Sequence, residues 1–350
     1  MSTFLLYGAN GYTGRLIARM SSEYGLTPIL AGRREDALKP MASELGLEYR
    51  IFDLSDTKRL EDTLREVPMV LHAAGPFIHT AKPMIEACLR THVHYTDITG
   101  EIVVFETAKR YDKQAQEAGI MVMPGIGFDV VPTDSLALHL KQQLPDATHL
   151  KLAFASLGGR YSRGTALTMS MGAGEKSAAR RDGRIVGVPL GEKGMWVDFG
   201  EKRLFVMSIP WGDVSTAYTT TGIPNIETYT GASPKTYNML RYQSLYNWIL
   251  RTPFMRARMQ KKIKNGPAGP TDEQRARSKS LVWGEVTNAA GVSKRARLKG
   301  PEGYTLTAMS SLLIAAKVLR KEFKTGYQTP AGCYGADLVM EIPGTFREDC

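Results

Sequence analysis

Three evenly spaced glycines near the N-terminus have the residue type and spacing that phosphate binding requires. The stretch FLLYGANGYTGRLIARM, residues 4–20, places Gly8, Gly11 and Gly14 between an apolar run and an amphipathic segment. In a strand-to-helix turn, such glycines allow a sharp turn, bring backbone N–H groups close to a pyrophosphate and let the helix pack closely on the strand. The same pattern also occurs as a purely structural turn. The neighbouring elements therefore decide between the two interpretations.

Short apolar runs alternate with helical patterns over residues 3–123. The predicted strands are 3–7, 27–31, 48–52, 69–73, 93–97 and 120–123, and the predicted helices are 14–24, 35–45, 57–64, 81–91 and 103–118. This alternation indicates an α/β fold with a doubly wound parallel sheet of Rossmann type. Because the glycine turn follows the first strand and opens the first helix, nucleotide binding is favoured over a structural turn.

The residues after the second predicted strand bear on the choice between NAD and NADP. An Asp or Glu there would hold the ribose 2′-hydroxyl of NAD, whereas the 2′-phosphate of NADP requires cations. The sequence places Gly32, Arg33 and Arg34 at this point, before the first carboxylate, Glu35. A guanidinium pairs bidentately with phosphate, so NADP(H) is favoured over two arginines that merely lie at the surface. Asp53, after the third strand, either contacts the adenine amino group or caps the next helix.

Three loops follow strands of the predicted sheet and are expected to face the ligand crevice. They are residues 73–77 (AAGPF), 97–101 (DITGE) and 125–134 (GIGFDVVPTD). Small residues in the first loop would let a nicotinamide ring lie flat. The other two loops bring polar residues toward that ring, namely Asp97, Thr99, Glu101, Asp129 and Asp134.

A reductase also needs a proton source, and two residues are candidate catalytic donors, Asp129 and Tyr95. None of the 15 tyrosines has a lysine four residues later, which disfavours the short-chain dehydrogenase class. His92 and His94 have no third ligand at a recognisable spacing, so no metal site is predicted.

The pattern changes after residue 135. We predict a dinucleotide-binding domain over residues 1–135, a second α+β substrate domain over 136–304, and C-terminal helices over 305–350 that return to the first domain. The segment 162–172 (SRGTALTMSMG) is expected to line the substrate pocket together with Phe77 and Phe128. Its apolar residues, which are also compatible with an ordinary core, are Leu167, Met169 and Met171.

A basic segment, residues 240–264, combines apolar and cationic side chains at helical spacing, and Pro253 should break or kink it. It is either a helix at an anionic membrane surface or a core-packed helix with a solvated basic face. The residues expected on the apolar side are Leu240, Leu245, Trp248, Ile249, Phe254 and Met255. The residues expected to face anions are Arg241, Arg251, Arg256, Arg258, Lys261 and Lys262.

The composition is that of an ordinary globular protein, with 43% hydrophobic and 23% charged residues. We expect a cytoplasmic protein, because no apolar stretch is long enough for a membrane span, no secretion signal is evident and the three cysteines are scattered. The net charge of +10 favours anionic ligands or partners, such as nucleotides, acidic acyl carriers or lipid headgroups. No pattern typical of nucleic-acid binding accompanies this charge, so nucleic acid is not an expected partner.

Several motifs together resemble the saccharopine dehydrogenase-like oxidoreductases, in particular the branch with the mycobacterial trans-acting enoyl reductases. They are GANGYTGRLIA, LAGRR, HAAGPF, YTDITGE and PGIGFDVVPTD. The resemblance implies a Rossmann domain, an inserted substrate domain and NADP(H) as cofactor. It places along the pyrophosphate and adenosine Gly8, Asn10, Gly11, Tyr12, Thr13, Gly32 and Arg33. It places near the ribose and nicotinamide Ala74, Gly75, Pro76 and Phe77.

The sequence thus predicts an NADPH-dependent oxidoreductase that reduces an enoyl or carbonyl group of an acyl or lipophilic substrate. The alternative is an NADP-binding sensor or membrane-surface scaffold without turnover. A saccharopine-type amino-acid dehydrogenase is less favoured, because the phosphate loop GANGYTG is written differently in those enzymes. An oligomer is compatible with either function.

Overall fold

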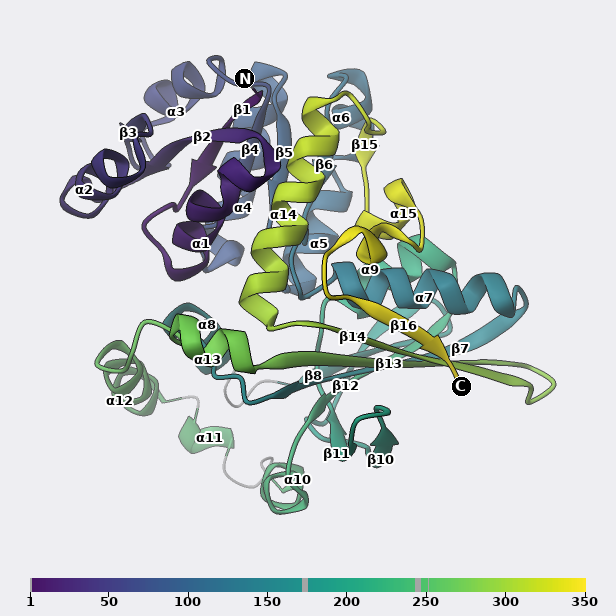
Figure 1. The fold of residues 1–350 in the computed structure, drawn as a ribbon. Coiled ribbons are helices and arrows are strands. Elements are labelled where there is room, and N and C mark those ends of the chain that lie inside the picture. The colour runs from purple at the N-terminus through teal and green to yellow at the C-terminus, as the bar shows by residue number, and fades with distance from the viewer. Residues whose placement is uncertain (1, 172–175, 243–246, 251) are drawn as a thin grey trace. The chain divides into compact units, whose positions relative to one another are not determined.

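A computed structural model of the protein describes residues 2–171, 176–242, 247–250 and 252–350 (Figure 1). The chain forms two compact units. Unit 1 consists of Met1–Val131 and Tyr304–Tyr334, and unit 2 consists of Pro132–Gly303 and Gly335–Cys350. We describe each unit by itself.

Unit 1 contains a seven-stranded sheet in the order β15-β6-β5-β4-β1-β2-β3, and all its strand pairs are parallel. The order changes direction at β1, which lies between β2 and β4, so the sheet is doubly wound. The strands are β1 (Ser2–Tyr7), β2 (Leu26–Gly32), β3 (Tyr49–Ile51), β4 (Met69–His72), β5 (His94–Asp97), β6 (Met121–Met123) and β15 (Gly326–Tyr327). The expected Rossmann-type α/β class is confirmed.

The helices of unit 1 mostly follow the expected pattern. They are α1 (Tyr12–Met20), η1 (Ser21–Tyr24), α2 (Glu35–Leu45), α3 (Thr57–Leu64), α4 (Phe77–Thr91), α5 (Ile102–Lys109), α6 (Asp112–Glu117), α14 (Gly303–Leu319) and α15 (Pro330–Tyr334). The single helix predicted over 103–118 is wrong. The chain turns at Tyr111, whose hydroxyl donates to Glu86 of α4 at 2.8 Å, and α6 begins after it.

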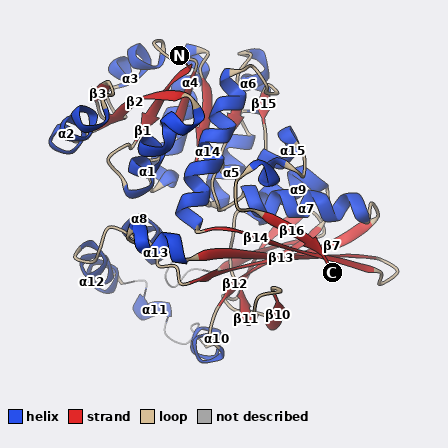
Figure 2. Cartoon of the chain, in the orientation of Figure 1, coloured by secondary structure: helices blue, strands red, loops and turns tan. Residues whose placement is uncertain are grey.

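Unit 2 is built on a mixed nine-stranded sheet (Figure 2). Its main path is β10-β11-β12-β7-β13-β14-β16, in which only β12 and β7 are parallel neighbours, and β8 and β9 form a hairpin beside β12. The strands are β7 (Ala147–Leu157), β8 (Ser177–Arg181), β9 (Arg184–Val188), β10 (Gly194–Asp198), β11 (Arg203–Ser208), β12 (Asn225–Gly231), β13 (Lys279–Asn288), β14 (Ser293–Pro301) and β16 (Phe346–Asp349).

One helix of unit 2 packs very closely on this sheet. A Cβ atom at Gly284 of β13 would lie 2.6 Å from Leu140 Cδ1 of α7, so only glycine leaves room for the helix. The helices and turns of the unit are α7 (Val131–Gln143), α8 (Arg163–Met171), α9 (Asp213–Thr221), α10 (Pro234–Arg241), α11 (Asn247–Leu250), α12 (Pro253–Lys264), α13 (Asp272–Arg277) and η3 (Leu338–Glu341). Among the helices in the described residues, none has both the length and the apolar character to cross a membrane.

The C-terminal segment, expected to return as a whole to the first domain, is divided between the units. Residues 304–334 belong to unit 1, where β15 extends the parallel sheet beside β6. Residues 335–350 belong to unit 2, because β16 pairs with β14 in antiparallel register, Arg297 opposite Glu348. The expected break at Pro253 is confirmed, since α12 begins at this proline, where the missing N–H costs nothing.

Candidate functional site

The glycine loop between β1 and α1 leaves no room for side chains. Gly8 has φ +88°, and a Cβ atom there would lie 2.7 Å from the backbone nitrogen of Ala74. A Cβ atom at Gly14 would lie 2.5 Å from the carbonyl oxygen of Gly8. The N–H of Gly11 donates to that same oxygen at 2.9 Å, and Gly11 is the N-cap of α1. Gly8 and Gly14 therefore have no room for a side chain, and at Gly11 a Cβ atom would lie 3.2 Å from the carbonyl oxygen of Gly8.

The N-terminus of α1 has the properties of an anion site. Gly11 supplies no side-chain cap, and the first turn contains no acidic residue. The positive end of the helix dipole and its first N–H groups can therefore receive a phosphate without competition from a carboxylate. Asn10, Tyr12 and Thr13 lie on this loop or in the first turn of α1, as the resemblance implies. This local structure fits a dinucleotide pyrophosphate.

The end of β2 lies beside the same loop. A Cβ atom at Gly32 would lie 3.2 Å from the Asn10 side-chain oxygen, which brings the two predicted cofactor segments together. Arg33 is 74% exposed, and its guanidinium lies 3.5 Å from the carboxylate of Asp53. Arg34 instead forms an ion pair with Asp36 on α2. Arg33 is therefore the arginine whose side chain approaches a second predicted cofactor residue.

Asp53 does not cap the following helix, so that alternative is wrong. The N-cap of α3 is Asp56, which accepts a hydrogen bond from the N–H of Arg59 at 3.1 Å. Asp53 accepts hydrogen bonds from the N–H and hydroxyl of Ser55, at 2.9 and 2.7 Å. These bonds, with Arg33 nearby, hold the pKa of Asp53 below its usual range. The other alternative, a contact with adenine, stays a prediction.

A buried histidine supports the loop predicted to approach the nicotinamide, Ala74 to Phe77. His72, the last residue of β4, lies 2.9 Å through Nε2 from the hydroxyl of Thr80, which donates to the carbonyl of Ala74 at 2.8 Å. Burial lowers the pKa of His72 to about 3, so the ring is neutral and its Nε2–H donates to Thr80. The ring also meets Phe77 edge-on, with centroids 5.3 Å apart. Sequence reasoning missed His72 and Thr80, although HAAGPF contains the former.

We predict that Thr80→Val lowers the free energy of unfolding by about 1 to 3 kcal/mol, because it leaves the buried Nε2–H of His72 without an acceptor. Urea unfolding followed by circular dichroism measures this loss. Thr80→Ser keeps the hydroxyl and should retain most of the stability. Equal destabilisation by both variants would show that the methyl group of Thr80, and not its hydroxyl, matters here.

Asp97 joins the two polar loops at the carboxyl end of the sheet. Its Oδ1 accepts hydrogen bonds from the N–H groups of Thr99 and Gly125, at 2.9 and 2.8 Å. Its Oδ2 accepts from the hydroxyl of Tyr95 at 2.5 Å. Burial raises the pKa of Asp97 to about 6. This carboxyl group is therefore committed to holding the loops together.

The two predicted proton donors occupy different surroundings. Tyr95 is fully buried in the core of unit 1, and burial raises its pKa well above the usual value. Asp129 is half-buried in the loop after β6, and its Oδ2 would lie only 2.5 Å from a Cβ atom at Gly100. Desolvation of its carboxyl group, together with the nearby charge of Glu101, raises the pKa of Asp129 to about 7. Asp129 is therefore the donor that the geometry favours.

Glu101 links the loop 97–101 to the loop predicted near the nicotinamide. Its carboxylate accepts hydrogen bonds from the N–H groups of Phe77 and Ile78, each at 3.0 Å, and so caps α4. This cap explains why α4 begins at Phe77 and not at Ala81, as the sequence suggested. Desolvation by burial raises the pKa of Glu101.

Helix α14, distant in sequence, supports both ends of the candidate site. The hydroxyl of Thr307 accepts from the N–H of Phe128 at 3.0 Å, and Ser310 donates to the carbonyl of Ile126 at 2.7 Å. At the glycine loop, the rings of Tyr304 and Tyr12 meet edge-on with centroids 5.0 Å apart. No sequence signal pointed to these contacts.

Residues 4–123 match the family model described as the saccharopine dehydrogenase NADP binding domain. The trans-acting enoyl reductase of Mycobacterium tuberculosis is 31% identical over 138 residues, 37% of this chain and 33% of that protein. The match thus spans about a third of the length of these curated relatives. A lipid droplet localized protein of Caenorhabditis elegans is 24% identical over 98% of this chain and 96% of its own.

The solved structures support the fold of the whole chain. Apo saccharopine dehydrogenase (L-Glu forming) from Saccharomyces cerevisiae aligns over the full length of both chains, with a TM-score of 0.67 and 13% identity. At that identity, the likeness shows the fold alone. The chain, including its second unit, therefore shares the fold of that enzyme.

Two further predictions concern residues outside the dinucleotide-binding domain. Asp134 belongs to unit 2, where it accepts a hydrogen bond from Thr220 of α9 at 2.6 Å. Of the expected pocket residues on α8, Met169 is exposed, and the side chain of Met171 lies outside the described residues.

In the part of the chain that the structure describes, histidine, cysteine and carboxylate side chains form no group of three or more suited to a metal ion.

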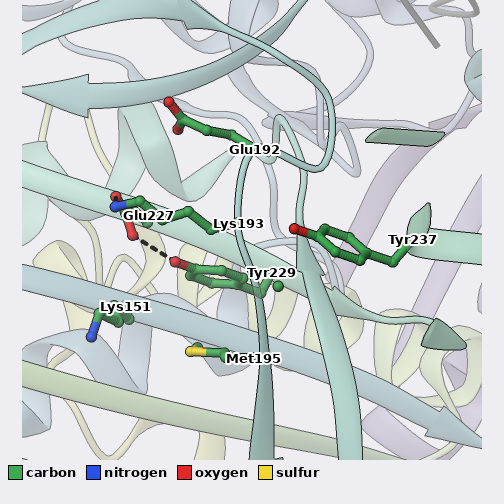
Figure 3. A pocket seen from close by; sticks show the side chains of 8 residues that line it. Lys151, Glu192, Lys193, Met195, Glu227, Tyr229 and Tyr237 are labelled. Atoms are coloured by element: carbon green, nitrogen blue, oxygen red, sulfur yellow. Dashed lines mark hydrogen bonds and ion pairs between the residues drawn. The ribbon is translucent and has the colours of Figure 1, made fainter. Parts of the chain in front are cut away.

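Unit 2 has a hollow of about 410 Å³ on its sheet (Figure 3). The hydroxyl of Tyr229 donates to Glu227 at 2.5 Å, and Glu227 also pairs with Arg181 and Lys193. Its carboxylate is thus already neutralised by protein cations. The hollow is lined by Lys151, Glu192, Lys193, Gly194, Met195, Glu227, Tyr229 and Tyr237. None of the predicted substrate residues lines it, and we assign it no ligand.

Proposed function

We propose that this protein is an NADPH-dependent reductase of an enoyl or carbonyl group in an acyl or other lipophilic substrate. The observation that carries the proposal is Asp129, whose pKa of about 7 lets its carboxyl group hold a proton at neutral pH. It lies at the carboxyl end of the sheet in a dinucleotide-binding domain. The name of the trans-acting enoyl reductases supports the choice of an enoyl substrate.

Different residues of the domain would bind different parts of the cofactor. The N-terminus of α1 would hold the pyrophosphate with its first N–H groups and the helix dipole, and Gly8 and Gly11 would let a phosphate approach because they carry no side chain. Arg33 would pair with the 2′-phosphate of NADP(H), which is the proposed cofactor. The supported loop from Ala74 to Phe77 would face the nicotinamide ring.

A bound NADPH would supply the hydride. Asp129 would then donate a proton from its carboxyl group to the carbon or oxygen of the substrate that becomes electron-rich. Burial of the carboxyl group, and to a smaller extent the nearby carboxylate of Glu101, would keep Asp129 protonated near neutral pH, because both disfavour ionisation. The Asp97 hydrogen bonds would keep both loops in place during the transfer.

The loss of NADPH absorbance with a panel of enoyl and carbonyl thioesters tests the proposal. We expect turnover with at least one acyl thioester. We expect no formation of NADPH when saccharopine, an amine that can only be oxidised, is supplied with NADP+. Tight NADPH binding without turnover of any thioester would instead favour the NADP-binding sensor or scaffold. Turnover restricted to saccharopine would favour an amino-acid dehydrogenase and contradict the proposed substrate class.

The delivery of an acyl substrate by an acidic carrier protein, and action as an oligomer in the cytoplasm, remain parts of this proposal. The positive net charge of +10 supports an acidic carrier. Sedimentation velocity and pull-down with an acyl carrier protein would test the oligomer and the carrier separately.

A further inference from the structure

Most of the positive net charge comes from one segment of unit 2. Residues 228–271 contain eight lysines and arginines and no aspartate or glutamate, in a chain of net charge +10. Five of these cations belong to the single helix α12, Pro253–Lys264. Helix α12 therefore carries a concentrated positive charge that no acidic residue of its own segment offsets.

The side chains of α12 separate into two faces. At about 100° per residue, one face groups Met255, Met259 and Ile263, which are half-buried, and α12 packs against α8 (Figure 1). The opposite face is exposed, and it consists of Phe254, Ala257, Arg258, Lys261, Lys262 and Lys264. We call these six residues the α12 outer face. The inner face alone thus makes the apolar contact that a core-packed helix requires.

Local contacts hold α12 in this orientation. The hydroxyl of Thr252 caps its N-terminus by accepting from the N–H of Met255 at 3.3 Å. After its C-terminus, the carbonyl of Ala268 accepts from the N–H of Arg163 at 2.9 Å, and the carbonyl of Gly266 accepts from the Arg163 guanidinium at 2.7 Å. Because Arg163 begins α8, the C-terminal end of α12 is fixed to α8 within unit 2.

Two aromatic side chains accompany the cations. Phe254 lies on the α12 outer face with 73% of its surface exposed, and Trp248 of the neighbouring helix α11 is 70% exposed. Among the residues predicted to lie on an apolar side, these two are exposed, whereas Leu240 and Met255 are half-buried. Leu245, Arg251 and the side chain of Ile249 lie outside the described residues.

The cations of the outer face have no partner among the described residues of the protein. In the described ranges, the side chains of Arg258, Lys261, Lys262 and Lys264 form no ion pair or hydrogen bond with one another or with other residues. Four cations held together on one exposed surface repel one another. A dense negative charge outside the molecule would therefore stabilise them. Transfer of the large exposed side chains of Phe254 and Trp248 from water to an apolar environment would be favourable.

We propose that the α12 outer face, together with Trp248, docks on an anionic lipid surface. Lipid headgroups would neutralise the lysines and arginines, while the two aromatic rings enter the boundary between headgroups and acyl chains. An acidic protein would neutralise the cations but would not by itself require exposed aromatic rings on the same and the neighbouring helix. This docking is independent of the proposed reductase activity, because it uses no residue of the dinucleotide-binding domain.

Co-sedimentation of the full chain with vesicles tests this proposal. We expect binding to vesicles of phosphatidylcholine and phosphatidylserine, little binding to phosphatidylcholine alone, and weaker binding at high salt. Lys261→Glu/Lys262→Glu should lower the partition coefficient roughly 600-fold, since each basic residue near the surface contributes about a fivefold factor and each reversal counts twice. Phe254→Ser should lower it by roughly tenfold without changing the charge.

The matched control is Lys58→Glu/Lys294→Glu, which makes the same change in net charge at two exposed positions outside α12. It should bind vesicles nearly as well as the wild type. NADPH binding checks that every variant is folded. Equal losses in the control and the α12 variant would show a nonspecific charge effect and overturn the proposal. Binding to an acidic acyl carrier protein but not to anionic vesicles would also overturn it, in favour of a protein partner.

Discussion

Asp129→Asn should lower kcat for NADPH-dependent reduction roughly 100- to 10,000-fold, the usual contribution of a positioned proton donor. Asparagine has nearly the same shape as aspartate but cannot transfer a carboxyl proton. The Kd for NADPH should stay within about twofold of the wild-type value, because Asp129 is not among the residues expected to hold the cofactor. Steady-state kinetics and cofactor titration of the same preparation separate these two effects.

The pH dependence gives a second measurement of the same residue. Because the donor must be protonated, kcat/KM of the wild type should fall as pH rises through about 7, the pKa to which burial and Glu101 raise Asp129. Asp129→Asn should lose this limb of the profile. A variant that keeps both its rate and the wild-type pH profile would show that water or another residue donates the proton.

Stability provides a readout of Asp129 that does not depend on substrate. Its pKa in the folded protein lies above the value of about 4 expected for an unfolded chain. The protonated carboxyl therefore favours folding fully below about pH 4, and this contribution is lost as pH rises toward and through about 7. Asp129→Asn should be less sensitive to this rise, so its stability relative to the wild type should increase between pH 5 and 8. Urea unfolding at several pH values measures the difference.

The sheet of unit 1 could be predicted because its signals are local. Each strand is a short apolar run followed by a turn and a helical pattern, and α2 and α3 begin and end where the sequence indicated. The glycine loop was predictable for the same reason, since Gly8, Gly11 and Gly14 contact one another or the adjoining strands. Contacts between residues that are close in sequence can be predicted from the spacing of the residue types.

The contacts that complete the site could not be predicted, because they join residues far apart in the chain. Thr307 bonds to Phe128 across 179 positions, and only the fold brings α14 to that loop. Burial is similarly a property of the fold. Tyr95 and Asp129 looked equally able to donate a proton, yet one lies in the core and the other is half-buried. The cap of α3 was also not predicted: the sequence pointed only to Asp53, and the structure shows Asp56 at the N-cap.

A comparison of NADPH binding with NADH binding should reveal the role of Arg33. A hydrogen bond to a charged group typically contributes about 1.5 to 3 kcal/mol, so Arg33→Ala should weaken NADPH binding roughly 10- to 100-fold and leave NADH nearly unchanged. Fluorescence titration at fixed ionic strength measures both dissociation constants, since salt screens phosphate binding.

Arg34→Ala is the matched control for Arg33→Ala. Arg34 is already paired with Asp36, whereas Arg33 lies beside Asp53 at the end of the neighbouring strand. The control should therefore change NADPH binding much less than Arg33→Ala. Gly11→Val should weaken both nucleotides, because the pyrophosphate that they share meets the N-cap of α1. If the wild type binds NADH as tightly as NADPH, or if Arg33→Ala leaves the ratio of the two constants unchanged, Arg33 does not recognise the 2′-phosphate. The arginines after β2 would then be surface residues at the start of a helix, and any preference for NADP that the wild type shows would have to come from another part of the domain.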